Sequence, residues 1–131
     1  MTANLEANKQ VVERFNDLLG KADFDAASEL TTNDFTWFAL LGRQTIPRAN
    51  AFSMLKTFTS ELFKEPVVYK TVSMIAQSDS VAAVVNGRGV KSDGGEYANL
   101  YHMLYELRDG KICRLLEFND TLYSNQAFGQ N

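Results

Sequence analysis

The order of its sequence patterns most constrains what this chain can fold into: helical periodicity fills the first half, and long β-rich runs fill the second. Apolar residues recur every three or four positions over residues 4–19 and again over residues 51–62. After Pro66, β-rich runs alternate with short turn-forming stretches. Because helices come first and consecutive strands follow, we predict an α+β fold and not alternating β–α–β units.

Three helices are predicted in the first half. The first spans residues 4–19 and ends before Gly20. Asp23 is expected to cap a short second helix, whose inward-facing residues are Ala26, Ala27 and Leu30. Pro47 suits the first turn of a third helix. That helix would bury one apolar stripe, made of Ala51, Phe52, Leu55, Phe58 and Leu62.

The predicted strands are Phe35–Leu41, which follows a turn at Asn33–Asp34, and then Val67–Ala76, Val81–Val90, Tyr97–Leu107 and Lys111–Leu122. Asp120–Thr121 is interpreted as a structural cap on the last strand. The stretch Ser124–Asn131 is polar apart from Phe128, and we expect it to be partly disordered. Bulges and turns account for the glycines at Gly87, Gly89, Gly94 and Gly95.

Both faces of the last two strands are substantially apolar. Over residues 97–107, Asn99, Tyr101, Met103 and Tyr105 share one face. In the final strand, Cys113, Leu115, Glu117 and Asn119 share a face and oppose Ile112, Leu116 and Phe118. The predicted helices can cover one side of this sheet, so something else must cover the second side. We predict a homodimer through that side, formed by Leu100, His102, Leu104, Leu116 and Phe118.

Composition excludes several classes of function. The net charge of −3 and the pI near 5.1 give no basic face for nucleic acid. No apolar run approaches the roughly 20 residues of a membrane span, and the first residues do not resemble a signal peptide. A cytoplasmic location is the expectation. The single cysteine, Cys113, and single histidine, His102, provide no disulfide and no zinc-ligand spacing. We expect no metal and no cofactor.

Several short segments then resemble a known family. The opening of the nuclear-transport-factor-2-like superfamily is similar to Val11–Phe15, Ala22–Ala26 and Asn33–Trp37. Its SnoaL-like (polyketide-cyclase-like) branch is similar to Gly87–Gly89, Tyr97–Tyr101, Asp109–Ile112 and Glu117–Thr121. The resemblance implies one domain over residues 1–131, with its core at about 5–123. It also implies a cone in which three helices close the concave side of a curved mixed or antiparallel sheet around a pocket.

The resemblance does not carry every family site. The helix tyrosine of the ketosteroid-isomerase branch corresponds to Phe15, and its strand carboxylate to about Ala39. Of the limonene-epoxide-hydrolase site, only the carboxylate position keeps an acid, Glu117. The arginine and second carboxylate of that site fall near Val84 and Asn86, with Arg88 on the same strand face.

Glu117 is the candidate catalytic residue, because a carboxyl group in a dry cavity has a raised pKa that suits acid–base work. The alternative is an ion pair with Arg88 or Arg114, or exposure at the pocket mouth. Candidate ligand-binding residues are Asn99, Tyr101, Arg88, Asn86, Trp37, Met103 and Phe58.

The leading hypothesis is a pocket protein that binds a small, largely apolar molecule carrying a carbonyl or hydroxyl group. Isomerase, cyclase, hydratase or hydrolase activity at Glu117 would need no cofactor. The alternative is a non-catalytic binding or dimeric accessory module, which a pocket filled by its own side chains would favour.

Overall fold

A computed structural model describes residues 4–39 and 42–129. Its elements are α1 (Leu5–Gly20), α2 (Phe24–Glu29), β1 (Thr31–Ala39), β2 (Gln44–Pro47), α3 (Arg48–Leu62), β3 (Val68–Gln77), β4 (Ser80–Val90), β5 (Glu96–Arg108), β6 (Lys111–Asn119) and α4 (Thr121–Ala127). The predicted α+β class is confirmed. Three expectations lie outside the described residues: the character of the first three residues, the strand end at Leu40–Leu41, and the tail at Gln130–Asn131.

Local chemistry starts the first two helices where the sequence predicts them. The Asn4 side chain accepts a hydrogen bond from the Ala7 amide at the start of α1, and Asp23 accepts one from the Ala26 amide at the start of α2. Such caps satisfy amides that have no partner within the helix. The apolar stripe of α1 then packs into the core, where Val12 and Phe15 are completely buried.

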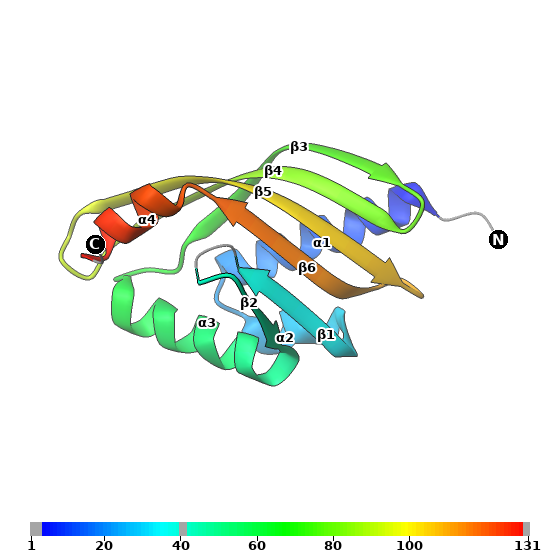
Figure 1. Ribbon diagram of the computed structural model, residues 1–131, viewed down its shortest axis with the longest axis horizontal. Helices are drawn as coiled ribbons and strands as arrows, with labels where there is room; N and C mark the ends of the chain where they lie inside the picture. Colours follow the sequence, from blue (N-terminus) through cyan, green and yellow to red (C-terminus); the bar gives the residue numbers. More distant parts are fainter. Residues whose placement is uncertain (1–3, 40–41, 130–131) are drawn as a thin grey trace.

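The strands form one open mixed sheet in the order β2-β1-β6-β5-β4-β3. All neighbouring pairs are antiparallel except β1 and β6, which are parallel. Helices α1, α2 and α3 pack against one side of this sheet, which we call the concave face. Figure 1 shows α1 behind the long strands, α3 beneath β1 and β2, and α4 beside the start of β5.

The first half of the chain differs from prediction at three points. Asn33 and Asp34 lie within β1 and do not form a turn; both are exposed where the pairing with β6 is irregular, which explains their polar character. The short strand β2 has no clear sequence pattern and was not predicted. Pro47 pairs with Thr36 and precedes α3 as its N-cap, one position before the predicted first turn.

The chain also ends differently. β6 stops at Asn119, and Asp120 caps the following helix by accepting a hydrogen bond from the Tyr123 amide. The prediction that Asp120–Thr121 caps the last strand is therefore wrong. The stretch after Ser124 is helical as far as Ala127, because this cap and the packing of Phe128 on Tyr97 hold it in place.

One irregularity changes the faces of β6. Glu106 pairs with Arg114 while Leu107 pairs with Ile112, so Cys113 is an extra residue in the ladder. A bulge of this kind shifts the alternation of side chains. Ile112 is consequently buried in the core and does not share a face with Leu116 and Phe118 as predicted.

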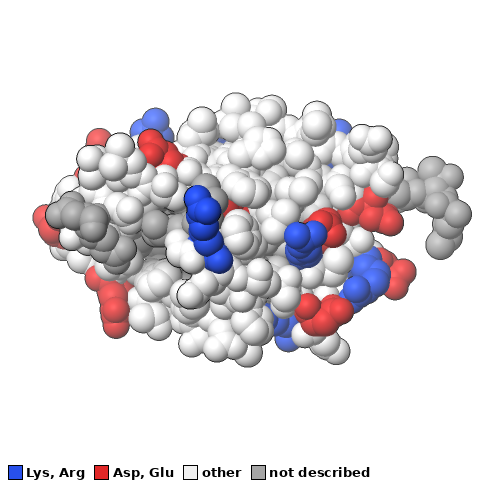
Figure 2. Space-filling model, in the orientation of Figure 1, with Lys and Arg blue, Asp and Glu red and all other residues white. Residues whose placement is uncertain are grey.

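The opposite, convex side of the sheet carries an apolar surface. The alternation predicted for β5 is confirmed: Tyr101, Met103 and Tyr105 are buried, whereas Leu100 is 54% exposed. Figure 2 shows few charged side chains over the central parts of β3, β4 and β5, in the same orientation as Figure 1.

Among the described residues, no helix is long and apolar enough to cross a membrane.

Candidate functional site

A cavity of about 330 Å³ lies between the concave face of the sheet and α3. One side is apolar and comes from α3, where it includes Ala51, Met54, Leu55 and Phe58. The opposite side comes from the strands and carries most of the polar groups. A space of this volume, largely apolar with a few convergent polar groups, is typical of a small-molecule site.

The polar side of the cavity is formed by residues that the sheet brings together from distant parts of the chain. They are Trp37 on β1, Tyr69 on β3, Tyr97 and Tyr101 on β5, Glu117 and Asn119 on β6, and Ser124 on α4. Four of the cavity-lining residues were predicted from the sequence: Trp37, Tyr101 and Glu117 on this polar side, and Phe58 on α3. Tyr69, Tyr97 and Ser124 were not.

Glu117 is the only carboxyl group among the described residues that line this cavity. Its Oε1 atom accepts a hydrogen bond from the Trp37 indole nitrogen at 3.1 Å, and its Oε2 atom accepts one from Asn119 Nδ2 at 3.3 Å. Trp37 reaches it because β1 and β6 are parallel neighbours, with Ala39 paired to Glu117 and Trp37 paired to Leu115.

Burial raises the pKa of Glu117 from its ordinary 4.5 to about 7, and the Trp37 hydrogen bond acts in the opposite direction. The cause is loss of hydration, which disfavours the charged form more than one indole N–H can offset. No ion pair with Glu117 forms within residues 4–39 and 42–129. Arg114, which the sequence offered as a partner, instead pairs with Glu106 at 2.8 Å.

Two predicted ligand-binding residues lie on the wrong side of the sheet. Val81, Ala83 and Val85 point into the core, so the alternation of β4 directs Asn86 and Arg88 to the convex face, where Arg88 is exposed. The prediction that they face the cavity is wrong. Its cause is that both faces of β4 are apolar, which leaves the sequence without a signal for the inward face.

Two others lie beside the cavity but do not line it. Met103 is packed in the core. Asn99 is buried behind the cavity wall, where it contacts Tyr97 and Ser124. Phe58 lines the cavity yet is 47% exposed. The prediction that it is buried in the helix stripe is wrong, because its side of α3 borders the open cavity and not the core.

Tyr69 and Tyr101, which line the cavity, remain neutral at physiological pH. Burial raises the pKa of Tyr69 and of Tyr101 well above the ordinary value of 10, and nearby acidic groups reinforce the shift. A neutral phenol is both a hydrogen-bond donor and an acceptor. The cavity therefore combines one titratable carboxyl group with uncharged hydroxyl groups on an otherwise apolar surface.

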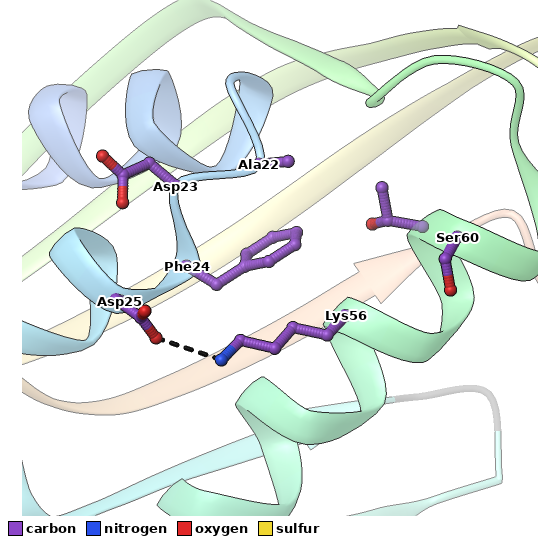
Figure 3. A pocket seen from close by; sticks show the side chains of 7 residues that line it. Ala22, Asp23, Phe24, Asp25, Lys56 and Ser60 are labelled. Carbon is purple, nitrogen blue, oxygen red and sulfur yellow. Dashed lines mark hydrogen bonds and ion pairs between the residues drawn. The ribbon is translucent and has the colours of Figure 1, made fainter.

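A second hollow, of about 350 Å³, lies between α2 and α3 and is lined by Phe24, Asp25, Lys56 and their neighbours. Figure 3 shows Lys56 reaching across it to Asp25, at 3.0 Å. Both charged groups are largely exposed and pair with each other. Such a surface pair contributes little, and this hollow offers no buried group for chemistry.

The geometry agrees with the fold class of the nuclear-transport-factor-2-like superfamily. In solved structures, the fold is similar to PrhC from Penicillium brasilianum (TM-score 0.87, 11% identity, covering 97% of this chain and 89% of that one). It is also similar to an LEH-like epoxide hydrolase from Mycobacterium tuberculosis (TM-score 0.79, 15% identity, 95% of this chain and 91% of that one covered). A third similar structure is a protein with a ketosteroid-isomerase-like fold from Catenulispora acidiphila, in complex with trimethylamine (TM-score 0.79, 14% identity, 92% and 93% covered).

The sequence itself gives the family. The model of the SnoaL-like domain matches residues 12–115, so this chain belongs to the SnoaL-like family. A search of curated proteins gave no match. The predicted membership of the SnoaL-like branch is confirmed. At these identities the solved structures establish the fold and leave the reaction open.

Proposed function

We propose that this protein binds a small, largely apolar molecule in the cavity and that Glu117 transfers a proton to or from it. The observation that carries the proposal is a single carboxyl group, among the described lining residues, in a largely apolar cavity, with its pKa raised to about 7. The reaction would be an isomerisation, cyclisation, hydration or hydrolysis that needs no cofactor.

The pKa of Glu117 suits acid–base chemistry near neutral pH. A group with a pKa close to the working pH populates both its protonated and its ionised form, so it can accept a proton in one step and return it in another. The hydrogen bonds from Trp37 and Asn119 hold the carboxyl group in one orientation. An oriented proton-transfer group beside an open space is what such catalysis requires.

The open cavity also supports a ligand. A filled pocket would have favoured a scaffold, yet Trp37, Met54 and Phe58 border a space of about 330 Å³ without closing it. Among proteins of similar fold, one is described as an epoxide hydrolase and another is bound to trimethylamine. These similarities support a small-molecule pocket in this protein.

The test combines ligand binding with turnover. Wild type, Glu117→Gln and the control Glu96→Gln, which alters an exposed glutamate at the start of β5, are screened by thermal shift against small hydrophobic ketones, epoxides and alcohols. Stabilising compounds are then followed for conversion by NMR. We expect Glu117→Gln to lose roughly a hundredfold or more in rate while the control keeps wild-type rate. Undiminished turnover by Glu117→Gln would contradict the proposal.

One observation favours a second candidate, a non-catalytic binding module. Phe15 occupies the position of the helix tyrosine of the ketosteroid-isomerase branch and is completely buried against Trp37 and Phe52. Ala39 similarly brings no acid to the cavity. Compounds that stabilise wild type and Glu117→Gln alike, with no conversion of any of them, would support this candidate.

We further propose that the convex face forms a homodimer. Strand pairing places one apolar row across five strands: Ile75, Ala82, Leu104, Leu116 and Phe38. Leu100, His102 and Phe118 extend the same surface. Leu104→Asp should convert a dimeric mass in light scattering to a monomeric one, whereas the control Leu122→Asp, at an exposed position on α4, should not. A monomeric wild type at micromolar concentration would refute the dimer.

A further inference from the structure

A chain of three hydrogen-bonded side chains runs along β5 and ends in the cavity. Asn99 Nδ2 lies 3.2 Å from the Tyr97 hydroxyl oxygen, and the Tyr97 and Tyr101 hydroxyl oxygens lie 2.5 Å apart. All three side chains are buried. Tyr97 and Tyr101 border the cavity, whereas Asn99 does not.

The backbone fixes the direction of this chain at Asn99. The amide nitrogen of Leu100 donates to Asn99 Oδ1 at 2.9 Å, so the oxygen of the side-chain amide must lie on that side. Its Nδ2 group is then the donor, and its three acceptors are Ser124 Oγ at 3.0 Å, the Tyr97 hydroxyl oxygen at 3.2 Å and, more distantly, the Asp120 carbonyl oxygen at 3.5 Å. Asn99 thus presents a donor, and not an acceptor, to the Tyr97 hydroxyl oxygen.

Counting protons leaves one hydroxyl hydrogen unused. Two hydroxyl groups share a single hydrogen bond, and neither has another acceptor among the described residues. Because Tyr97 already accepts from Asn99, its own proton is best used toward Tyr101, and hydrogen bonds aligned in one direction strengthen each other. Either hydroxyl could donate this bond; with Tyr97 as the donor, the free hydrogen belongs to Tyr101, which borders the cavity.

We propose that this chain makes Tyr101 a dedicated donor, so that the cavity selects ligands that carry an acceptor oxygen, such as a ketone, over the corresponding alcohols. Tyr97 and Asn99 act as positioning residues that set the polarity of Tyr101. This proposal rests on the proposed function for the location of the ligand, and it narrows the ligand class from carbonyl or hydroxyl compounds to carbonyl compounds.

The position of Tyr101 suits a ligand that also reaches Glu117. Tyr101 pairs with Asn119, which is two residues from Glu117 on the same face of β6. Diagonal neighbours of this kind lie roughly 7–8 Å apart. A ligand oxygen held by Tyr101 would therefore leave the neighbouring part of the same molecule within reach of the Glu117 carboxyl group.

The test compares two fluorescent naphthalenes in which a ketone carbonyl replaces a CH₂ group: 6-propionyl-2-(dimethylamino)naphthalene and 6-propyl-2-(dimethylamino)naphthalene. Wild type should bind the ketone more tightly, by roughly three- to tenfold, the usual worth of one hydrogen bond. Tyr101→Phe should abolish this preference and move the emission of the bound ketone to shorter wavelength. Tyr69→Phe, which removes the neighbouring cavity phenol, should leave the preference intact.

Asn99→Asp tests the polarity directly, because the carboxylate it introduces is nearly isosteric but accepts a hydrogen bond where the amide donates one. Tyr97 would then donate to that carboxylate and Tyr101 to Tyr97, so Tyr101 would no longer donate into the cavity, while the Tyr69 hydroxyl would stay as it is. At pH 8 we expect this variant to lose its preference for the ketone and to favour the alcohol made by reducing that ketone. A purely structural role for Asn99 would weaken all three ligands equally.

Two results would overturn the proposal. One is an unchanged preference for the ketone in Tyr101→Phe, or a preference lost in Tyr69→Phe instead; this pair decides the matter even if Asn99→Asp does not fold. The other is failure of wild type to bind either naphthalene. None of these measurements involves turnover, so loss of the proposal on Tyr101 with a normal effect of Glu117→Gln on rate would leave the proposed function standing.

Discussion

Replacing Glu117 by glutamine should make the protein more stable at alkaline pH and leave it nearly unchanged at acidic pH. The native carboxyl group has a pKa of about 7, against 4.5 for the ordinary group. Below pH 4.5 both native and unfolded chains carry the proton, so the group contributes no pH dependence. Between the two values the native chain keeps a proton that the unfolded chain loses, and the free energy of unfolding falls as pH rises.

The size of the effect follows from the two pKa values. Their difference corresponds to about 3 kcal/mol of stability lost by wild type above pH 7. This is an upper limit, because the side chain is only partly buried in a cavity that solvent can enter. Glutamine carries no charge to desolvate and can still accept a hydrogen bond from Trp37. The free energy of unfolding of Glu117→Gln should therefore not fall between the two pKa values.

Urea unfolding measures this difference, with Trp37, the only tryptophan, as the fluorescent reporter. Glu117→Gln should match wild type within about 1 kcal/mol at pH 4 and exceed it by up to about 3 kcal/mol at pH 8. The control Glu96→Gln should follow wild type at both pH values. A Glu117→Gln variant that is destabilised equally at both pH values would refute the reasoning. It would show that the hydrogen bonds of the carboxyl group stabilise the fold and that burial does not disfavour its ionised form.

Three further changes test the surroundings. Trp37→Phe should raise the pKa of Glu117 further, because the indole N–H favours the ionised form; a fall, observed by carboxyl ¹³C NMR titration, would contradict this. Met103→Ala should cost about 2–5 kcal/mol in urea unfolding through a core cavity, whereas a negligible loss would place Met103 outside the core. Asp120→Ala should cost about 1 kcal/mol by removing the α4 cap, and unchanged amide protection in α4 by hydrogen exchange would show that the cap is dispensable.

Most of the fold was predictable because its elements have strong periodicity. The four long strands after Pro66 were predicted to within a few residues at nearly every end, and the inward face of β5 was assigned correctly. The large side chains of Tyr101 and Tyr105 lie on this inward face, and smaller or polar side chains alternate with them on the other face. Glu117 was placed in the site because the resemblance puts the carboxylate of the limonene-epoxide-hydrolase branch at this position.

The wrong predictions occur where the alternation of side chains does not reveal which face of a strand is buried. The extra residue at Cys113 reverses the faces of β6 between Ile112 and Leu116, and no sequence pattern marks it. In β4, apolar residues occupy both faces, so Arg88 could not be assigned to the convex face. For β3 no inward face was predicted, so Tyr69 was missed; a second irregularity, between Thr71 and Ser73, also interrupts its alternation.

Gly87 links the strand that was misassigned to the chain of hydrogen bonds that ends in the cavity. The sequence suggested a bulge here, yet the pairing of β4 with β5 is regular through Gly87. A Cβ atom at this position would lie 2.7 Å from Cε1 of Tyr101 and 3.4 Å from Cε1 of Tyr69. Because Gly87 has no side chain, the ring of Tyr101 can occupy this space. From there its hydroxyl group reaches the Tyr97 hydroxyl group. Any larger residue would displace that ring, so the direction of the Tyr101 hydroxyl depends on β4 as much as on β5.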